Sequence, residues 1–423
     1  MQRREFISRS ISVSAFASLP LSELYTQVNA NATRSSSGDD KTFDAIVIGV
    51  GSTGSATCYY LAKQGLNVLG LEQFDIPHEL GSHAGQSRII RKAYFEHPDY
   101  VPLLQRAYQN WKSLEDESRA QLYFKTGLLY FGKSDSPLIK GLRESAQKYS
   151  IEVNDLTAKQ LSTQFPQFDI PEGYDRLIEP DAGFVTPERA ILLYTERALQ
   201  NGASIHTKEK TLAWDKSANV ITVKTNKDTY QCNKLIITVG PWAGKVIPDL
   251  TKNLNVTRQM VAWVKPKKWQ PFELGNFPCW TIADDARPGI YYGFPILNTA
   301  KFGGPIGLKL AHHTPGAISD PDTVNRIPLE EDESNLVSAL NKFIPDGYES
   351  THVMKTCLYT NTPDENFILD FLPGYDKDVV VASGFSGHGF KFASVVGEIL
   401  SDMAVKGNTS QPIGFLNVKR FSK

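Results

Sequence analysis

Residues 43–54 decide the fold of this chain and read Phe43-Asp44-Ala45-Ile46-Val47-Ile48-Gly49-Val50-Gly51-Ser52-Thr53-Gly54. The first half is mostly apolar and β-branched, as in a parallel strand that is covered on both faces. The second half contains the pattern Gly-x-Gly-x-x-Gly. In such a pattern Gly49 makes the tight turn, Gly51 lets the backbone approach a pyrophosphate, and Gly54 permits close helix–strand packing. The stretch therefore predicts a dinucleotide at the start of a helix.

The segments that follow complete a strand–helix–strand unit. We expect a helix over residues 55–65, just after Ser52, and a second strand over residues 67–71. Glu72 ends this strand at close to the spacing of roughly 20 residues that is typical of a ribose-binding acid. NAD and FAD both fit the unit, so the choice between them stays open on these residues alone.

Two later segments again combine an apolar strand with a glycine turn. One is residues 234–239, followed by Gly240, Pro241 and Trp242. The other is residues 379–383, followed by a turn with Gly384, Gly387 and Gly389 and then by a helix towards Met403. The second turn would direct backbone N–H groups and a helix N-terminus at a negative group, such as an anionic reduced flavin. The alternative is that its glycines only relieve steric crowding.

Composition places the chain among soluble globular proteins. It has 423 residues, 45 Lys+Arg against 46 Asp+Glu, and 41% hydrophobic residues. These values argue against disordered, collagen-like and multi-span membrane classes, and no basic block indicates nucleic acid as a partner. No apolar run reaches the roughly 18–20 residues of a membrane span, so stable membrane insertion is not expected. The length predicts more than one domain.

The N-terminal segment, residues 1–32, carries features of an export signal. It begins with Arg3 and Arg4, continues through a mildly apolar stretch at residues 11–24, and ends in Ala30-Asn31-Ala32. The final pattern is typical of a cleavage site. We therefore expect a twin-arginine signal outside the fold, the twin-arginine export machinery as a partner, a bacterial periplasmic location, and a linker at residues 33–42. An ordinary N-terminal helix with two arginines is the alternative.

The cysteines are far apart in the sequence, at Cys58, Cys232, Cys279 and Cys357. No Cys-x-x-Cys pair is present, so neither a zinc site nor a disulfide framework is indicated. Buried free thiols are the ordinary expectation for such residues. We predict no metal site.

Six motifs carry a resemblance to known proteins: Gly49–Gly54, Gly81–Arg91, Ile290–Pro295, Gly307–Leu310, Cys357–Thr360 and Gly384–Phe392. Together they resemble the family of monomeric sarcosine oxidase and N-methyltryptophan oxidase, FAD-dependent amine oxidases of the D-amino acid oxidase superfamily. The resemblance implies an α/β fold with a discontinuous Rossmann-type FAD-binding domain and a substrate domain built on a large mixed β-sheet. It places the first at residues 43–122, 186–256 and 364–423, and the second at residues 123–185 and 257–363. The sequence pattern adds strands around residues 122–132 and 291–310 and a helix over residues 330–343.

The resemblance also implies roles for single residues. Cys357 would be bonded covalently to the flavin. Arg91 and Lys391 would hold the substrate carboxylate, and Arg88 would lie beside the flavin, where its charge favours the reduced form. Lys309 would stabilise negative charge on oxygen as it is reduced.

Tyr292, His313 and Tyr359 match positions of the substrate pocket. His312 adjoins His313, so a shift of one residue in the match would exchange them. The catalytic residues expected are Lys309, Arg88, His313 and Tyr292. The residues expected to contact the cofactor are Gly49, Gly51, Ser52, Gly54, Glu72, Gly81, Ser82, Arg88, Gly240, Trp242, Cys357, Gly384, Gly387, Gly389 and Lys391.

The activity implied by the resemblance is oxidation of secondary amines of N-methyl amino acids, with O2 reduced to H2O2, by a monomer. Residues 296–302 are more than the family has at this turn, and we expect them near the pocket, which leaves the substrate open. A flavin dehydrogenase that passes electrons to a quinone or carrier protein is one alternative, and an inactive nucleotide-binding protein is another. An NAD-dependent dehydrogenase would leave the glycine turn after residue 383 unexplained.

Overall fold

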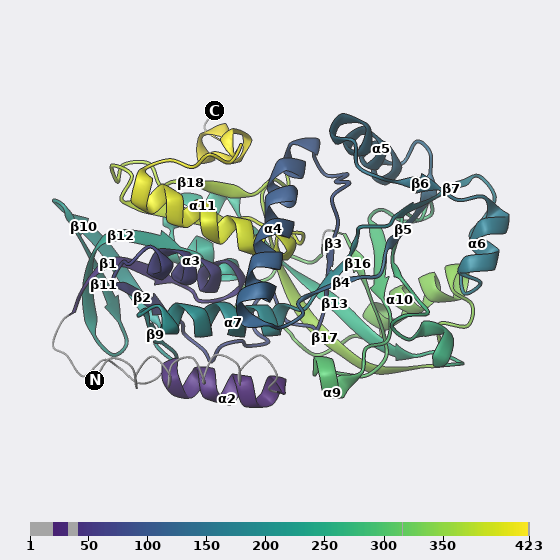
Figure 1. Ribbon diagram of the computed structural model, residues 1–423, viewed down its shortest axis with the longest axis horizontal. Helices are drawn as coiled ribbons and strands as arrows, with labels where there is room; N and C mark the ends of the chain where they lie inside the picture. The colour runs from purple at the N-terminus through teal and green to yellow at the C-terminus, as the bar shows by residue number, and fades with distance from the viewer. Residues whose placement is uncertain (1–19, 33–40, 315, 422–423) are drawn as a thin grey trace.

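The computed structural model describes residues 20–32, 41–314 and 316–421. These residues form two parts that lie side by side, each around a large β-sheet (Figure 1). A small sheet of β3 (Arg88–Ile90), β8 (Gly183–Val185) and β4 (Tyr123–Lys125) lies where the chain passes between them.

The first sheet has β1 (Thr42–Ile48) at its centre. β1 pairs in parallel with β2 (Val68–Leu71) on one side and with β12 (Thr229–Ile237) on the other. The remaining strands extend the sheet: β9 (Ser204–His206) beyond β2, β19 (Val379–Ser383) and β18 (Ile368–Phe371) beside β12, and the antiparallel β11 (Val220–Thr225) and β10 (Thr211–Ser217) at the edge. The predicted parallel strands are therefore present and adjacent, although they are far apart in the sequence.

Helices pack on this sheet through a shared apolar cluster. They are α3 (Ser52–Lys63), α4 (Val101–Ser118), α7 (Pro187–Gln200) and α11 (Ala393–Lys406). The short α8 (Ala243–Val246) belongs to a second apolar cluster, through Ala243. α3 contacts both α7 and α11. A Cβ at Gly397 of α11 would lie 2.5 Å from the Cβ of Ala56 in α3, so only glycine permits this close approach.

The second sheet is mixed and has the order β17–β13–β16–β15–β14–β5–β7–β6. Their bounds are Ser350–Asn361, Asn255–Lys265, Leu308–His313, Ile290–Phe294, Cys279–Ile282, Leu128–Lys133, Tyr174–Glu179 and Asn154–Asp155. β5 and β14 are parallel, while their other neighbours are antiparallel. Helices α5 (Pro137–Tyr149), α6 (Ala158–Gln164), α9 (Thr299–Phe302) and α10 (Glu330–Phe343) accompany this sheet. The predicted fold class, with a Rossmann-type part and a large mixed sheet, is confirmed.

Residues 21–32 form a helix, α2 (Leu21–Ala32), that packs against α7 and β9 (Figure 1). The structure differs here from the expectation that all of residues 1–32 lie outside the fold, because Leu24, Val28 and Ala32 share one face of α2 and are buried. The two arginines of the expected export signal lie outside the described residues.

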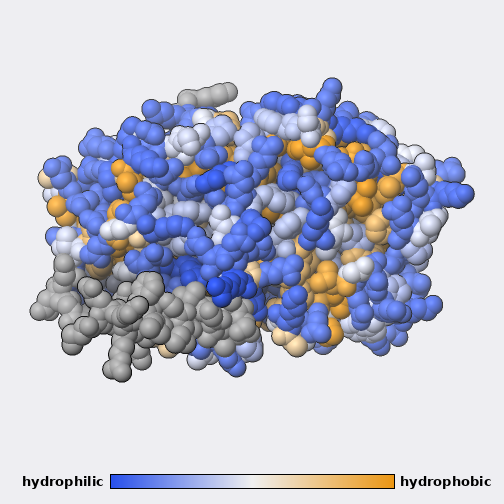
Figure 2. Space-filling view, in the orientation of Figure 1, coloured by the Kyte–Doolittle hydropathy of each residue, from blue (hydrophilic) through white to orange (hydrophobic). Residues whose placement is uncertain are grey.

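The face visible in Figure 2 is mainly hydrophilic, and its hydrophobic residues form separate groups. Within the described residues, no helix is both long and apolar enough to cross a bilayer.

Candidate active site

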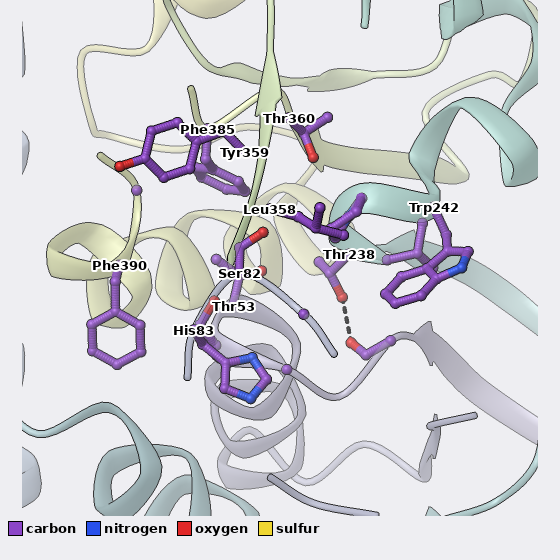
Figure 3. Close-up of a pocket in the computed structure, with 18 of the residues that line it drawn as sticks. Thr53, Ser82, His83, Thr238, Trp242, Leu358, Tyr359, Thr360, Phe385 and Phe390 are labelled. Atoms are coloured by element: carbon purple, nitrogen blue, oxygen red, sulfur yellow. Dashed lines mark hydrogen bonds between the residues drawn. The ribbon is translucent and has the colours of Figure 1, made fainter. Parts of the chain in front are cut away.

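A cavity of about 850 Å³ runs from the N-terminus of α3 to β17 and to the turn before α11. Figure 3 shows Thr53, Ser82 and His83 near α3, with Leu358, Tyr359 and Thr360 of β17 facing them across the cavity. Trp242 and Phe385 come from the two later glycine turns. The three glycine turns that follow predicted strands therefore meet at this one cavity.

The first glycine turn is built for close backbone contact. Gly49 has a φ of +89°, and a Cβ there would lie 2.7 Å from the carbonyl oxygen of Thr238. A Cβ at Gly54 would lie 1.8 Å from the carbonyl oxygen of Gly49. The Thr238 hydroxyl donates to that same oxygen at 2.7 Å (Figure 3). Gly51 faces the cavity instead, and a Cβ there would lie 3.7 Å from the Nδ1 of His83.

Glu72 lies at the end of β2 and is 4% exposed. Its carboxylate accepts hydrogen bonds from the N–H groups of Val50 and Phe74, both at 3.0 Å. Burial raises the pKa of Glu72 to about 7, against the effect of these hydrogen bonds. The acid is thus fixed beside the glycine turn, where it lines the cavity.

Cys357 and Arg88 meet near the centre of the cavity. An Nη atom of Arg88 lies 4.0 Å from the Cys357 Sγ, and the guanidinium donates to the carbonyl oxygens of Ser87 at 2.9 Å and Ser82 at 3.2 Å. Cys357 is partly exposed, whereas the other three cysteines are buried. Burial raises the pKa of Cys232 and Cys279 to about 12. Cys357 is therefore the cysteine that is placed to react in the cavity.

Lys309 lies on β16 and is 2% exposed. Its Nζ donates to the carbonyl oxygens of Gly85 and Ser87, the latter at 2.6 Å, and contacts the Ser87 hydroxyl at 3.1 Å. The ring of Phe294 lies 4.4 Å from the same nitrogen. Burial, with the nearby charge of Arg88, lowers the pKa of Lys309 well below its ordinary value. Lys309 is thus bound to the backbone of residues 85–87 and lies outside the cavity lining.

Arg91 is buried beside Glu96. One Nη atom donates to both carboxylate oxygens of Glu96, at 2.6 and 2.7 Å. The rings of Tyr94 and Phe95 each lie 4.4 Å from the guanidinium carbon. Burial by itself would raise the pKa of Glu96, but the positive charge of Arg91 has the larger effect and lowers this pKa to about 2. The guanidinium therefore has an internal carboxylate partner in this structure.

Lys391 is a second buried cation on the same side. Its Nζ donates to the carbonyl oxygen of His388 at 2.8 Å. Burial and Arg91 lower the pKa of Lys391 to about 7, although Glu96 acts in the opposite direction. The His388 ring bonds Tyr94 at 2.5 Å through Nδ1 and the Glu365 carbonyl oxygen at 3.1 Å through Nε2. Both nitrogens of His388 are thus engaged, and this residue fixes the turn that carries Lys391.

Tyr292, Tyr359 and His313 line the cavity next to these cations. The Nδ1 of His313 lies 3.4 Å from the Tyr359 hydroxyl, and burial lowers the pKa of His313 to about 4. His312 points to the other face of β16, where it stacks on Tyr291 at 4.1 Å and is bonded by Asn335. The two adjacent histidines therefore lie on opposite faces of β16, and only His313 lines the cavity.

Residues 44–403 match the family described as FAD dependent oxidoreductase. The chain belongs to this family. It is 38% identical to monomeric sarcosine oxidase of Bacillus sp. (strain NS-129) over 383 residues, which cover 89% of this chain and 97% of the relative. It is 33% identical to N-methyl-L-tryptophan oxidase of Citrobacter koseri, over 90% of this chain and 100% of the relative.

The fold has a close counterpart among solved structures. The open form of NikD, an unusual amino acid oxidase essential for nikkomycin biosynthesis, superposes with a TM-score of 0.78 at 23% identity. The superposition covers 89% of this chain and 97% of NikD. The resemblance that the motifs indicate is confirmed by the family match and the curated relatives.

The residues of this FAD dependent oxidoreductase fit the cofactor. Gly51 leaves the N-terminus of α3 open to a phosphate, and Glu72 is fixed where an acid suits a ribose hydroxyl. Among the described residues, the Nε2 of His83 is buried without a hydrogen-bond partner beside Gly51. Arg88 lines the same cavity beside Cys357, where its charge suits a ring that becomes more negative when reduced.

The cavity brings together most residues predicted for the site of this oxidoreductase. Those that line it are Gly49, Gly51, Ser52, Glu72, Gly81, Ser82, Arg88, Arg91, Gly240, Trp242, Tyr292, His313, Cys357, Tyr359, Gly384, Gly387, Gly389 and Lys391. Gly54 packs inside the turn, and Lys309 is bound to the backbone of residues 85–87. A Cβ at Gly387, where φ is +80°, would lie 2.3 Å from the Tyr359 ring, so packing also requires this glycine. Within the described residues, no cluster of metal-binding side chains is present.

Two features of the site differ from the sequence-based expectations. The extra residues 296–302 do not line the cavity, because Phe302 of α9 packs against Phe124 and Phe184 instead. Glu96 and His388 were not predicted as functional residues. Glu96 follows Arg91 by five positions, and His388 lies within the glycine turn, but neither pattern by itself indicates its buried contacts.

Proposed function

We propose that this FAD dependent oxidoreductase oxidises secondary amines of N-methyl amino acids and reduces O2 to H2O2. The observation that carries the proposal is the group of buried cations Arg91 and Lys391 beside the aromatic wall of Tyr292 and Tyr359. A small amine that also bears a carboxylate suits such a site. The curated relatives are named for sarcosine and N-methyl-L-tryptophan, which are both N-methyl amino acids.

The chain's own residues bind and orient the substrate in this proposal. Arg91 and Lys391 hold the carboxylate, and Tyr359 and Tyr292 enclose the N-methyl group. His313 is neutral at ordinary pH, since its pKa is lowered to about 4, and its Nδ1 faces the Tyr359 hydroxyl. Fixed position and charge therefore contribute more to the rate than proton transfer does.

Bound FAD would supply the acceptor for the two electrons of the C–H bond next to the substrate nitrogen and would pass them to O2, which with two protons gives H2O2. Hydrolysis of the substrate imine would give the primary amine and formaldehyde. Arg88, which lines the cavity, would stabilise negative charge on the cofactor.

We infer that the flavin is bonded to Cys357. The partial exposure of this thiol, its place in the cavity lining and the guanidinium of Arg88 at 4.0 Å support the assignment. The three other cysteines are buried.

A flavin dehydrogenase is the second candidate. One observation favours it: Lys309, the residue proposed to promote the reaction with O2, does not line the cavity. Its Nζ donates instead to the carbonyl oxygens of Gly85 and Ser87. We nevertheless propose the oxidase, since the backbone that binds Lys309 adjoins Arg88, which lines the cavity, and the curated relatives are named as oxidases.

Export through the twin-arginine pathway to a bacterial periplasm is part of the proposal and rests on Arg3, Arg4 and the small-residue patterns that follow. A monomer is also proposed, in keeping with the name of the relatives.

The experiment measures two properties of one enzyme preparation: whether the flavin stays with the protein in acid, and whether substrate oxidation produces H2O2. Acid precipitation of the purified enzyme should leave the yellow colour in the pellet. The Cys357→Ser variant should release the colour into the supernatant. The control Cys279→Ser, in which a hydroxyl replaces the thiol beside Thr126, should keep the colour in the pellet. N-methyl amino acids should then produce H2O2. Colour released from the wild type would contradict the covalent bond, and flavin reduction without peroxide would favour the dehydrogenase.

A further inference from the structure

Helix α2 lies before residue 44, where the family match begins, so it is a feature of this chain outside the matched region. Its carboxyl-terminal residues are the same Ala30-Asn31-Ala32 that resemble a cleavage site. Cleavage there would remove the whole helix. The contacts of α2 decide whether that is compatible with the folded enzyme.

One face of α2 belongs to the main apolar cluster. Leu24, Val28 and Ala32 are 0%, 1% and 0% exposed, and they share this cluster with residues of α3 and α7. Their spacing of four residues places them along one side of the helix. Loss of α2 would expose the part of α7 and β9 that these side chains cover.

Asn29 forms hydrogen bonds from α2 to the loop that follows Glu72. Its Oδ1 accepts the N–H of Ile76 at 2.9 Å, and its Nδ2 donates to the carbonyl oxygen of the same residue at 2.6 Å. Ile76 is 1% exposed and lies between Glu72 and His78, which both line the cavity. α2 therefore braces one wall of the cofactor site.

The first turn of α2 reaches the other part of the molecule. The Leu21 Cδ2 lies 2.9 Å from where a Cβ of Gly303 would be. The carbonyl oxygen of Gly303 in turn accepts a hydrogen bond from Gln86 in the loop that encloses Lys309. Figure 1 shows α2 running beneath α7 towards α9. The helix thus contacts both parts.

Proteases cut exposed, extended segments. Ala32 is buried within a helix and does not meet this requirement. The sequence contains the same small-residue pattern earlier, at Ala15-Phe16-Ala17, ahead of Pro20, whose carbonyl oxygen accepts the first N–H groups of α2. We propose that α2 is a permanent part of the folded enzyme and that the leader is cleaved after Ala17, not after Ala32. The cleavage step rests on the proposed export, whereas the role of α2 does not.

The first test compares two purified chains, one starting at Ser18 and one at Thr33, each loaded with FAD. We expect the shorter chain to unfold several degrees lower and to lose flavin faster on dilution. Equal unfolding temperatures and equal flavin retention would overturn the role of α2.

Point variants keep the test decisive if the shorter chain does not fold. Val28→Asp and Asn29→Ala should lower the unfolding temperature, and Asn29→Ala should also speed flavin loss. The matched controls Thr26→Asp and Asn31→Ala lie on the exposed side of α2 and should behave as wild type. Buried-face variants that match their controls would contradict the proposal.

The cleavage site is read by N-terminal sequencing and intact mass of enzyme exported from a host with twin-arginine transport. We expect a chain that begins at Ser18. A start at Thr33 would overturn the whole inference, and an uncleaved chain would overturn the cleavage site alone. Neither result depends on which amine is oxidised, so failure of the proposed activity remains distinguishable.

Discussion

Arg91 and Glu96 form a two-point ion pair at the end of the cavity that we assign to the substrate, with oxygens at 2.6 and 2.7 Å from one guanidinium nitrogen. The other Nη atom donates to the Ala93 carbonyl oxygen at 3.0 Å, so both terminal nitrogens of Arg91 already have partners. A substrate carboxylate must therefore displace an internal partner before it binds. The measured affinity for the substrate then reflects how much more strongly Arg91 binds the substrate carboxylate than it binds Glu96.

Glu96→Gln should strengthen the binding of a carboxylate ligand. Removal of the internal charge takes away the competitor, and a gain of about tenfold in Kd corresponds to about 1.4 kcal/mol. The free energy of unfolding should fall by about 3 kcal/mol without ligand, since Arg91 is left buried without its anion. Titration of the flavin absorbance with a carboxylate analogue that cannot be oxidised reads the first effect, and unchanged affinity would contradict it.

Binding of the same analogue should depend on pH through Lys391. Burial lowers the pKa of this residue to about 7, and a lysine is charged below its pKa. Affinity for the anion should therefore be high below pH 7 and weaken as the pH rises above it. Lys391→Met should be weak at every pH, whereas Lys391→Arg should lose the dependence because it stays charged. A flat profile in the wild type would show that Lys391 keeps its charge throughout.

The glycine turn and its surroundings could be predicted from sequence because their requirements are local. The contacts of Gly49 and Gly54 leave no room for a side chain, and such positions are visible as glycines. β19 and α10 begin and end where the apolar patterns place them. The sequence left His312 and His313 interchangeable. The structure separates them, because His313 lines the cavity and His312 stacks on Tyr291.

Contacts between a side chain and backbone carbonyl oxygens leave no pattern in the sequence that would predict them. Lys309 is held by carbonyl oxygens of Gly85 and Ser87, which any residue would offer, so its position needed the structure. The pairing of Arg91 with Glu96 arises from the path of a loop. Residues 21–32 are consistent with both a cleavable signal and an amphipathic helix, and only the packing of Leu24 and Val28 separates these interpretations.

Lys309→Met should slow the reaction of the reduced flavin with O2 by about a hundredfold, the size of effect seen when one preorganised electrostatic group is removed. The rate of flavin reduction by substrate should change much less, since Lys309 does not line the cavity. Rapid mixing of reduced enzyme with O2 separates the two rates. Lys112→Met on the exposed side of α4 is the control. Equal O2 rates in the two variants would remove Lys309 from the mechanism.

The loop that encloses Lys309 is itself fixed by Glu188. One carboxylate oxygen of Glu188 accepts the N–H groups of Gly85 at 2.7 Å and Gln86 at 3.0 Å, and Gln86 has a left-handed φ of 72° that the loop must hold. Glu188→Ala leaves both donors unsatisfied, which should cost about 2 kcal/mol of stability. Because the carbonyl of Gly85 also binds Lys309, the O2 reaction should slow severalfold while flavin reduction stays near wild type. Glu188→Gln keeps an acceptor oxygen and should restore most of the O2 rate; a Gln variant as slow as the Ala variant would show that the charge of Glu188, rather than its hold on the loop, supports Lys309.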